Sequence, residues 1–198
     1  MLSRIQFLVE GFFQSSSRLF HRAGLSPNSL TVIGFLLSIF ASTFYWGGLS
    51  GLEWGAAILV LLVGSFFDAV DGAMARKYAS VSRFGGVLDS VLDRLGEIAL
   101  YSGLIAGSLI QPWIGIWALS AALMVSYVRA RVGVEGITLK GMGIAERPER
   151  LLILILATLF WPVSQAILAG GVLLVAVLSS ITVVTRVYRA SRILSKAQ

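Results

Sequence analysis

Residues 66–93 read FFDAVDGAMARKYASVSRFGGVLDSVLD and place four aspartates, at positions 68, 71, 89 and 93, inside two otherwise apolar segments. A charged side chain near the centre of a bilayer costs about 2.5–3.5 kcal/mol on insertion scales. Four such side chains without compensation would cost on the order of 10 kcal/mol. Positive groups must therefore lie among these acids.

The spacing of the aspartates brings them together. Asp68 and Asp71 are three residues apart, and Asp89 and Asp93 are four apart, so each pair shares one helix face. Counting inward from the basic turn between the segments, Asp71 and Asp68 lie about 7 and 12 Å deep, and Asp89 and Asp93 about 9 and 15 Å deep. Because the two helices are antiparallel neighbours, we expect all four carboxylates to meet.

The charge and chemistry of this cluster indicate a metal site. Two divalent cations balance four carboxylates, and ligands that offer only oxygen favour Mg²⁺ or Mn²⁺. Two metals side by side suit a displacement at a phosphate. The small residues Gly72, Ala75, Gly85 and Gly86 leave room beside the acids for a nucleotide or phosphate.

Two other interpretations of the cluster remain open. The acids form structural salt bridges with Arg76, Arg83 and Arg94, or they line a path for protons or divalent cations. A transport path usually continues in polar groups toward the outer side, where Glu97 is almost the only such group. Neither alternative explains the small residues beside the acids.

The composition of the chain is that of a membrane protein. Of the 198 residues, 57% are hydrophobic and 13% are charged, about half the charged share of a soluble domain. The absence of cysteine excludes disulfides and thiolate sites, and a single histidine argues against a zinc site or a histidine-based triad. We predict an all-α, polytopic membrane protein.

Apolar runs near the 20 residues needed to cross a bilayer predict six transmembrane helices. The expected spans are 29–48, 54–77, 84–108, 114–131, 149–160 and 167–186, within one membrane domain at 25–198. Residues 1–24 alternate apolar and basic positions at helical spacing, which predicts an amphipathic helix in the membrane interface.

The basic residues gather at one side of these spans. Of the 16 lysines and arginines, all except Arg94 lie near the start of the first, third or fifth span or near the end of the second, fourth or sixth span. They are Arg4, Arg18, Arg22, Arg76, Lys77, Arg83, Arg129, Arg131, Lys140, Arg147, Arg150, Arg186, Arg189, Arg192 and Lys196. The positive-inside rule then places both termini and the aspartates on the cytoplasmic side of the membrane. The net charge of +6 thus reflects topology, and no nucleic-acid partner is expected.

The aspartate segment resembles the signature of the CDP-alcohol phosphotransferase family. The matching pattern is Asp68-x2-Asp71-Gly72-x2-Ala75-Arg76-x8-Gly85-x3-Asp89-x3-Asp93, with all eight positions present. Family members displace CMP from a CDP-linked alcohol with a second alcohol. The resemblance extends to the six spans and the N-terminal helix, and it also implies a homodimer.

The resemblance assigns roles to the matching residues. It implies that Asp68, Asp71 and Asp89 ligate the metals, and that Asp93 contacts the second metal and acts as general base. The residues expected to contact the CDP-lipid are Asp68, Asp71, Gly72, Ala75, Arg76, Gly85 and Thr31. Thr31 and Asn28, near the start of the first span, either cap that helix or contact the nucleotide.

Arginines outside the signature indicate the acceptor. Arginine binds phosphate through a rigid fork of donors, and this chain carries arginines at the cytoplasmic ends of three spans. The expected phosphate-binding residues are Arg129, Arg131, Arg147, Arg150 and Arg186, although simple topogenic charge is the alternative. Their sequences, YVRAR, ERPER and TVVTR, resemble the phosphatidylinositol phosphate and archaetidylinositol phosphate synthase branch of the family.

These observations predict an enzyme that transfers the lipid phosphate of CDP-diacylglycerol or CDP-archaeol to inositol 1-phosphate. Glycerol 3-phosphate is the alternative acceptor, since it also needs a phosphate pocket. From other classes, a divalent-cation transporter and a structural scaffold remain as alternatives. Neither the donor lipid nor the roles of Arg94 and Glu97 follow from the sequence.

Overall fold

The computed structural model describes residues 2–78, 80, 82–138 and 143–195, and these residues form helices joined by turns without any strand. The helices are α1 (Leu2–Arg22), α2 (Pro27–Trp46), α3 (Glu53–Lys77), α4 (Arg83–Ala106), α5 (Pro112–Val134), α6 (Arg147–Leu159) and α7 (Gln165–Leu194). The all-α prediction is confirmed for this part of the chain. Lys140 and Lys196 lie outside the described residues.

The six expected spans correspond to α2 to α7, with differences in length. Four of the described helices, α2, α3, α5 and α7, are long and apolar enough to cross a membrane. α4 has 24 residues but carries Asp89, Asp93, Arg94 and Glu97. α6 has only 13 residues and is about 20 Å long, shorter than a hydrocarbon core of about 30 Å.

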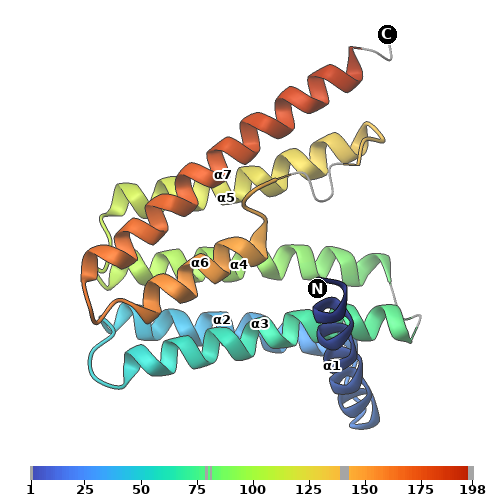
Figure 1. Cartoon of the computed structure of the whole chain (residues 1–198), viewed down its shortest axis with the longest axis horizontal. Helices are drawn as coiled ribbons and strands as arrows, with labels where there is room; N and C mark the ends of the chain where they lie inside the picture. The colour runs from blue at the N-terminus through green and yellow to red at the C-terminus, as the bar shows by residue number, and fades with distance from the viewer. Residues whose placement is uncertain (1, 79, 81, 139–142, 196–198) are drawn as a thin grey trace.

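The helices form a bundle in which α2 packs against both α3 and α4, while α7 packs against α5 and α6. Figure 1 shows α2, α3 and α4 lying side by side, with α5 and α7 above them. α6 begins partway along α4 rather than at its end (Figure 1). Residues at the start of α6 therefore lie inside the bundle.

Serine caps begin three of these helices. The backbone N–H of Ser29 donates to Ser26 Oγ (3.1 Å) at α2, and that of Gly85 donates to Ser82 Oγ (2.8 Å) at α4. Ser164 caps α7 in the same way. Such a cap satisfies one of the unpaired amides of the first turn. The cap of α2 is thus Ser26, and Asn28 is left for another role.

Glycines bring α2 and α4 into backbone contact near the C-terminal ends of both helices. A Cβ on Gly107 would overlap the carbonyl oxygen of Tyr45, and one on Gly103 would overlap that of Ser42. Only glycine fits where two helix backbones approach this closely. This crossing fixes α4 against α2 along the half of the bundle away from the aspartates.

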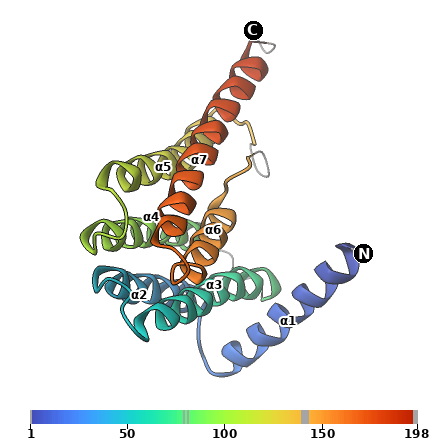
Figure 2. The same ribbon diagram turned by 60° about the vertical axis from the view of Figure 1, so that its left-hand side comes forward.

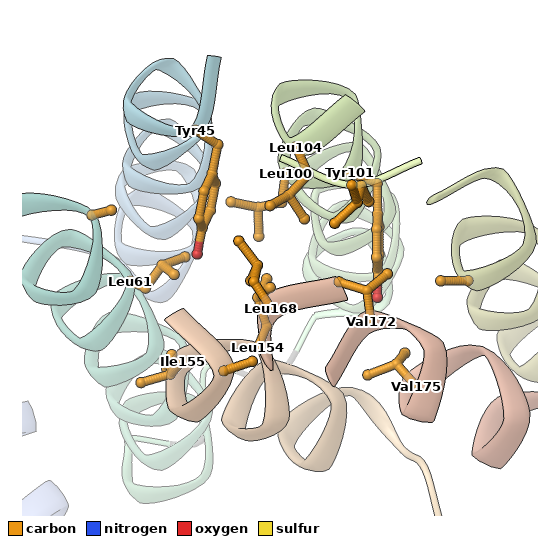
Figure 3. Packing of buried hydrophobic residues seen from close by; sticks show 14 of the residues in the cluster. Tyr45, Leu61, Leu100, Tyr101, Leu104, Leu154, Ile155, Leu168, Val172 and Val175 are labelled. Atoms are coloured by element: carbon orange, nitrogen blue, oxygen red, sulfur yellow. The ribbon is translucent and has the colours of Figure 1, made fainter. Parts of the chain in front are cut away.

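A core of buried side chains fills that half of the bundle. Figure 3 shows Tyr45, Leu100, Leu104, Leu154 and Leu168 meeting between α2, α4, α6 and α7. Thr158 of α6 ties the core to two other helices, because its hydroxyl bonds Tyr45 Oη (2.7 Å) and its carbonyl accepts from Trp54 Nε1 (2.6 Å). The apolar core thus lies at this end of the bundle, and the aspartates lie toward the other end.

α1 packs on the polar end of α3 and diverges from the bundle toward the N-terminus (Figure 2). Phe13 and Phe20 contact Phe66, and Phe20 also contacts Phe67. Lys77 Nζ donates to the carbonyl oxygen of Gln14 (3.0 Å). These contacts anchor α1 beside the segment that carries the first two aspartates.

Candidate active site

Three of the four expected aspartates gather where α3 and α4 face each other. One oxygen from each of Asp68, Asp71 and Asp89 lies within 4.8 Å of the other two. Asp71 is buried, and Asp68 and Asp89 are partly buried. This confirms the proximity that the spacing of these residues and the antiparallel pairing of their helices predicted.

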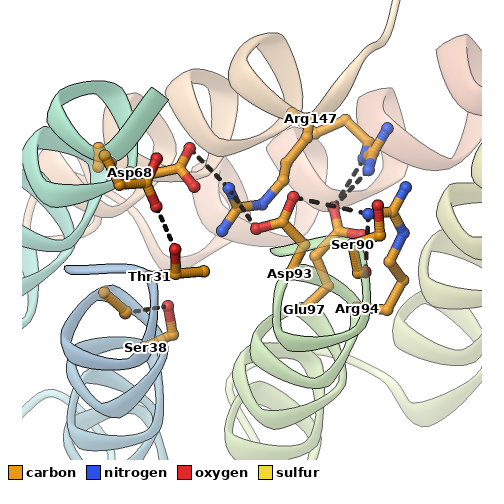
Figure 4. Close-up of polar contacts among 12 residues, drawn as sticks. Thr31, Ser38, Asp68, Ser90, Asp93, Arg94, Glu97 and Arg147 are labelled. Carbon is orange, nitrogen blue, oxygen red and sulfur yellow. Dashed lines mark hydrogen bonds and ion pairs between the residues drawn. The ribbon is translucent and has the colours of Figure 1, made fainter. Parts of the chain in front are cut away.

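Asp93 is joined to this group through an arginine. Arg147 Nη1 lies 2.8 Å from Asp93 Oδ1 and 2.8 Å from Asp68 Oδ2. Figure 4 shows the Arg147 side chain reaching from α6 between the two acids. Arg94 Nη1 is 3.6 Å from the other oxygen of Asp93. Within the described residues, the close acid cluster thus has three members, and Asp93 stands beside it on the same face of α4.

The three clustered aspartates fit a hard divalent cation. They offer only carboxylate oxygens, close enough together for a single ion to reach one from each residue. Asp71 is also held in place, because Thr31 Oγ1 donates to Asp71 Oδ2 (2.6 Å) in a buried contact. Such a bond orients a ligand toward its metal.

A narrow cavity of about 160 Å³ lies on one side of the aspartates. Its lining includes five of the residues expected to bind the CDP-lipid, which are Asp71 and the smaller Thr31, Gly72, Ala75 and Gly85. Further lining residues are Pro27, Asn28, Ser80, Ser82, Gly86 and Asp89. The motif did not single out Ser80 and Ser82, because they belong to the turn whose path the sequence does not define.

A side chain at position 85 would crowd the edge of this narrow cavity. A Cβ on Gly85 would lie 2.8 Å from Ser82 Oγ and 2.9 Å from Asn28 Oδ1. Both distances are too short for a carbon atom. Asn28 therefore comes close to the start of α4 and faces the cavity, where it can contact a ligand.

A wide cavity of about 620 Å³ lies on the other side of the aspartates. Its acids are Asp68, Asp89, Asp93 and Glu146, and its cations are Arg76, Arg94, Arg129, Arg147, Arg150 and Arg186. Among the described residues, Asp89 is the single one that lines both the narrow and the wide cavity. Arg76, expected on the CDP side, lines the wide cavity instead.

The expected acceptor arginines divide into three kinds. Arg129 and Arg147 line the wide cavity, whereas Arg131 is not among its described lining residues and instead bonds Glu135 Oε1 (2.6 Å) at the surface. Arg150 and Arg186 line the cavity but are buried, with 3% and 1% exposure. Each of these two is held by protein groups.

The buried arginines form defined ion pairs. Arg150 donates to Glu97 Oε1 from Nε (3.0 Å) and Nη2 (2.5 Å). Arg186 donates to the carbonyl oxygen of Val125 (2.7 Å) and to Glu146 Oε1 (2.8 Å). The ion pair with Arg150 gives a structural role to Glu97, for which the sequence indicated none. Glu146 and Arg94 are site residues that sequence reasoning missed.

The arrangement suits chemistry at a phosphate. Carboxylates able to hold a divalent cation lie between two cavities, one lined by small residues and the other by arginines. Arginine matches the geometry of a phosphate through parallel hydrogen bonds. Asp93 is placed in the wide cavity, where it can accept a proton from a bound alcohol.

Comparison with known proteins identifies similar chains. Residues 25–184 match the family model of CDP-alcohol phosphatidyltransferase. The archaetidylinositol phosphate synthase of Pyrococcus horikoshii is 40% identical over 195 residues, which is 97% of each chain.

Solved structures of one enzyme share the fold. The Mycobacterium tuberculosis phosphatidylinositol phosphate synthase with CDP-DAG bound has a TM-score of 0.79 and 29% identity, covering 90% of this chain and 92% of that one. The same enzyme in complex with manganese and citrate has a TM-score of 0.76 and 30% identity, covering 90% of this chain and 88% of that one.

Proposed function

The chain belongs to the CDP-alcohol phosphatidyltransferase family, and we propose that it transfers the phosphatidyl-type group of a CDP-linked lipid to inositol 1-phosphate, releasing CMP. The observation that carries this proposal is the position of Asp89 at the junction of the two cavities. One cavity holds most of the residues expected to bind the donor, and the other holds most of the arginines expected to bind the acceptor.

The narrow cavity takes the cytidine diphosphate part of the donor. Its glycines and Ala75 allow a nucleotide to approach the backbone of α3 and α4, and Asn28, Ser80 and Ser82 offer polar groups to it. The structure of the M. tuberculosis relative with CDP-DAG bound supports this assignment, since its fold covers 90% of this chain. The lipid is CDP-diacylglycerol or CDP-archaeol, the donors used by the two named branches.

The wide cavity takes the phosphorylated acceptor. Six arginines and four acids line it, so the charge left by the side chains is positive and suits a phosphate dianion. Arg129 and Arg147 are the arginines best placed to bind that phosphate. Similarity over 97% of the chain to an archaetidylinositol phosphate synthase supports inositol 1-phosphate as the acceptor.

The reaction is a displacement at phosphorus. The acceptor hydroxyl gives its proton to Asp93, and its oxygen bonds to the lipid-bearing phosphorus of the donor as the bond to CMP breaks. Asp68, Asp71 and Asp89 would hold divalent metal, Mg²⁺ or Mn²⁺, and Asp93 would be a ligand of a second ion. When bound, the ions neutralise the diphosphate and the departing CMP. The manganese complex of the M. tuberculosis relative supports the use of a divalent metal.

We place this chemistry at the cytoplasmic face of a prokaryotic cell membrane. In the proposed topology α2 to α7 are the six membrane helices, α1 lies in the interface, and both termini face the cytoplasm. The basic residues at one end of the helices support this orientation. The short α6 is accommodated because its N-terminus starts inside the bundle. A homodimer is the proposed assembly.

An acceptor panel tests the proposed function. Purified protein with a CDP-lipid and Mn²⁺ is offered inositol 1-phosphate, glycerol 3-phosphate and unphosphorylated inositol, and CMP release and the lipid product are measured. We expect product with inositol 1-phosphate alone. Turnover with glycerol 3-phosphate alone would assign the other acceptor. Uptake of divalent metal into liposomes without CMP release would contradict the enzyme function and assign a transporter function instead.

A further inference from the structure

The segment 143–147 carries Arg147 into the wide cavity, and α7 holds its backbone. Thr182 Oγ1 accepts hydrogen bonds from the backbone N–H groups of Ile144 (3.2 Å) and Ala145 (3.3 Å). The same hydroxyl donates to the carbonyl oxygen of Leu178 (2.8 Å), so all of its bonds are to protein. Thr182 is 1% exposed and has no direct access to a substrate.

The other polar backbone group of Ala145 is held by Arg150. Arg150 Nη1 donates to the carbonyl oxygen of Ala145 (2.8 Å), while Nε and Nη2 bond Glu97. Glu97 lies one helical turn after Asp93 on the same face of α4. The Glu97–Arg150 pair therefore connects the helix of Asp93 to the segment that carries Arg147.

We infer that Thr182 and the Glu97–Arg150 pair are positioning residues that set the affinity for the phosphorylated acceptor by fixing Ala145, two residues before Arg147. The inference rests on the proposed function. The inference also changes the role expected for Arg150. All three of its side-chain nitrogens bond protein groups, so Arg150 supports the Arg147 segment and does not bind the phosphate itself.

The physical reason is the precision that a charged contact requires. The guanidinium of Arg147 reaches both Asp68 and Asp93 at 2.8 Å, so its placement depends closely on its backbone. A misplacement of about 1 Å at a site can cost about 100-fold in rate. Valine at position 182 keeps the shape of threonine but removes the acceptor of the part-buried N–H of Ile144 and the buried N–H of Ala145, so we expect the segment to shift.

Three variants of α7 test the inference. Thr182→Val is compared with Thr182→Ser, which keeps the acceptor oxygen, and with Thr185→Val, where the lost hydroxyl bonds only the carbonyl of Ile181 in its own helix. For Thr182→Val we expect the acceptor KM to rise about tenfold or more, and the donor KM to stay within about twofold of wild type. Thr182→Ser restores the acceptor KM, and Thr185→Val resembles wild type.

Thermal unfolding and size-exclusion chromatography in detergent show whether each variant is folded. Should Thr182→Val not yield folded protein, Glu97→Gln probes the other anchor, and the same selective rise in acceptor KM is expected. An equal rise in both KM values, or no difference from Thr185→Val, overturns the inference while leaving the proposed function in place. A wild-type protein without transfer to any phosphorylated alcohol overturns both.

Discussion

Arg147 Nη1 lies 2.8 Å from Asp93 Oδ1, although the two residues are 54 positions apart in the chain and belong to different helices. The same nitrogen also contacts Asp68, so one guanidinium joins the expected base to the cluster of three aspartates. The acids proposed to activate the reaction and the arginine proposed to bind the acceptor are thus one connected group. Substitutions at single residues separate their contributions.

Asp93→Asn removes the proposed base and keeps the shape of the side chain. We expect CMP release to fall by about 100-fold or more, because general base catalysis contributes about 10²–10⁴-fold. Binding of the CDP-lipid, measured by thermal stabilisation, should remain. Full activity in this variant would exclude Asp93 as the base.

Arg147→Ala tests the acceptor pocket. The acceptor KM should rise about tenfold or more and the donor KM much less, since a lost charge-assisted hydrogen bond costs about 1.5–3 kcal/mol. Arg131→Ala is the matched control, because Arg131 pairs with Glu135 at the surface. A larger effect on the donor KM, or an equal effect of Arg131→Ala, contradicts the assignment.

Thr31→Val tests the orientation of Asp71. We expect the apparent affinity for Mn²⁺ to fall by about tenfold, because bonds to metal ligands contribute about 10–100-fold to affinity. The readout is the rise in Tm on titrating Mn²⁺ into protein stripped with EDTA, which does not depend on turnover. Thr43→Val is the control, because the Thr43 hydroxyl bonds only its own helix. Unchanged Mn²⁺ affinity would separate Thr31 from the metal site.

Gly85→Ala tests the narrow cavity. The added Cβ meets Ser82 Oγ and Asn28 Oδ1 at less than 3 Å, so these groups must move and the donor KM should rise about tenfold. Gly55→Ala on α3, where a Cβ meets nothing within 4 Å, should leave the donor KM unchanged. If both variants bind the CDP-lipid like wild type, Gly85 has no role in the donor site.

The sequence predicted the part of the site that depends on local helix geometry. Asp68, Asp71 and Asp89 meet because their spacing and the short turn between α3 and α4 determine their positions. Arg129 and Arg131 are two residues apart and so point to different sides of α5, which is why one lines the wide cavity and the other does not. Helix periodicity therefore argues against both arginines facing one cavity, but it does not say which one does, and the sequence prediction included both.

The remainder depends on contacts between distant segments. Arg147 and Arg150 share a face of α6, as expected, but Glu97 engages Arg150 from 53 residues away. No local pattern reveals that pairing. The inward path of the chain before α6 likewise depends on Thr182 of α7 and is not encoded in the segment itself. The short length of α6 was expected, since the predicted span 149–160 corresponds to Arg147–Leu159, whereas α7 extends to Leu194, beyond the expected end at residue 186.

The narrow and wide cavities have no described lining residue in common except Asp89, which has a stereochemical consequence. In the proposed reaction, donor and acceptor occupy these two cavities at the same time, and we expect the acceptor oxygen to approach the phosphorus from the side opposite CMP. A single in-line substitution of this kind inverts the configuration at phosphorus. A donor made chiral at that phosphorus with sulfur and oxygen isotopes should give the inverted product, and double-reciprocal plots for the two substrates should intersect.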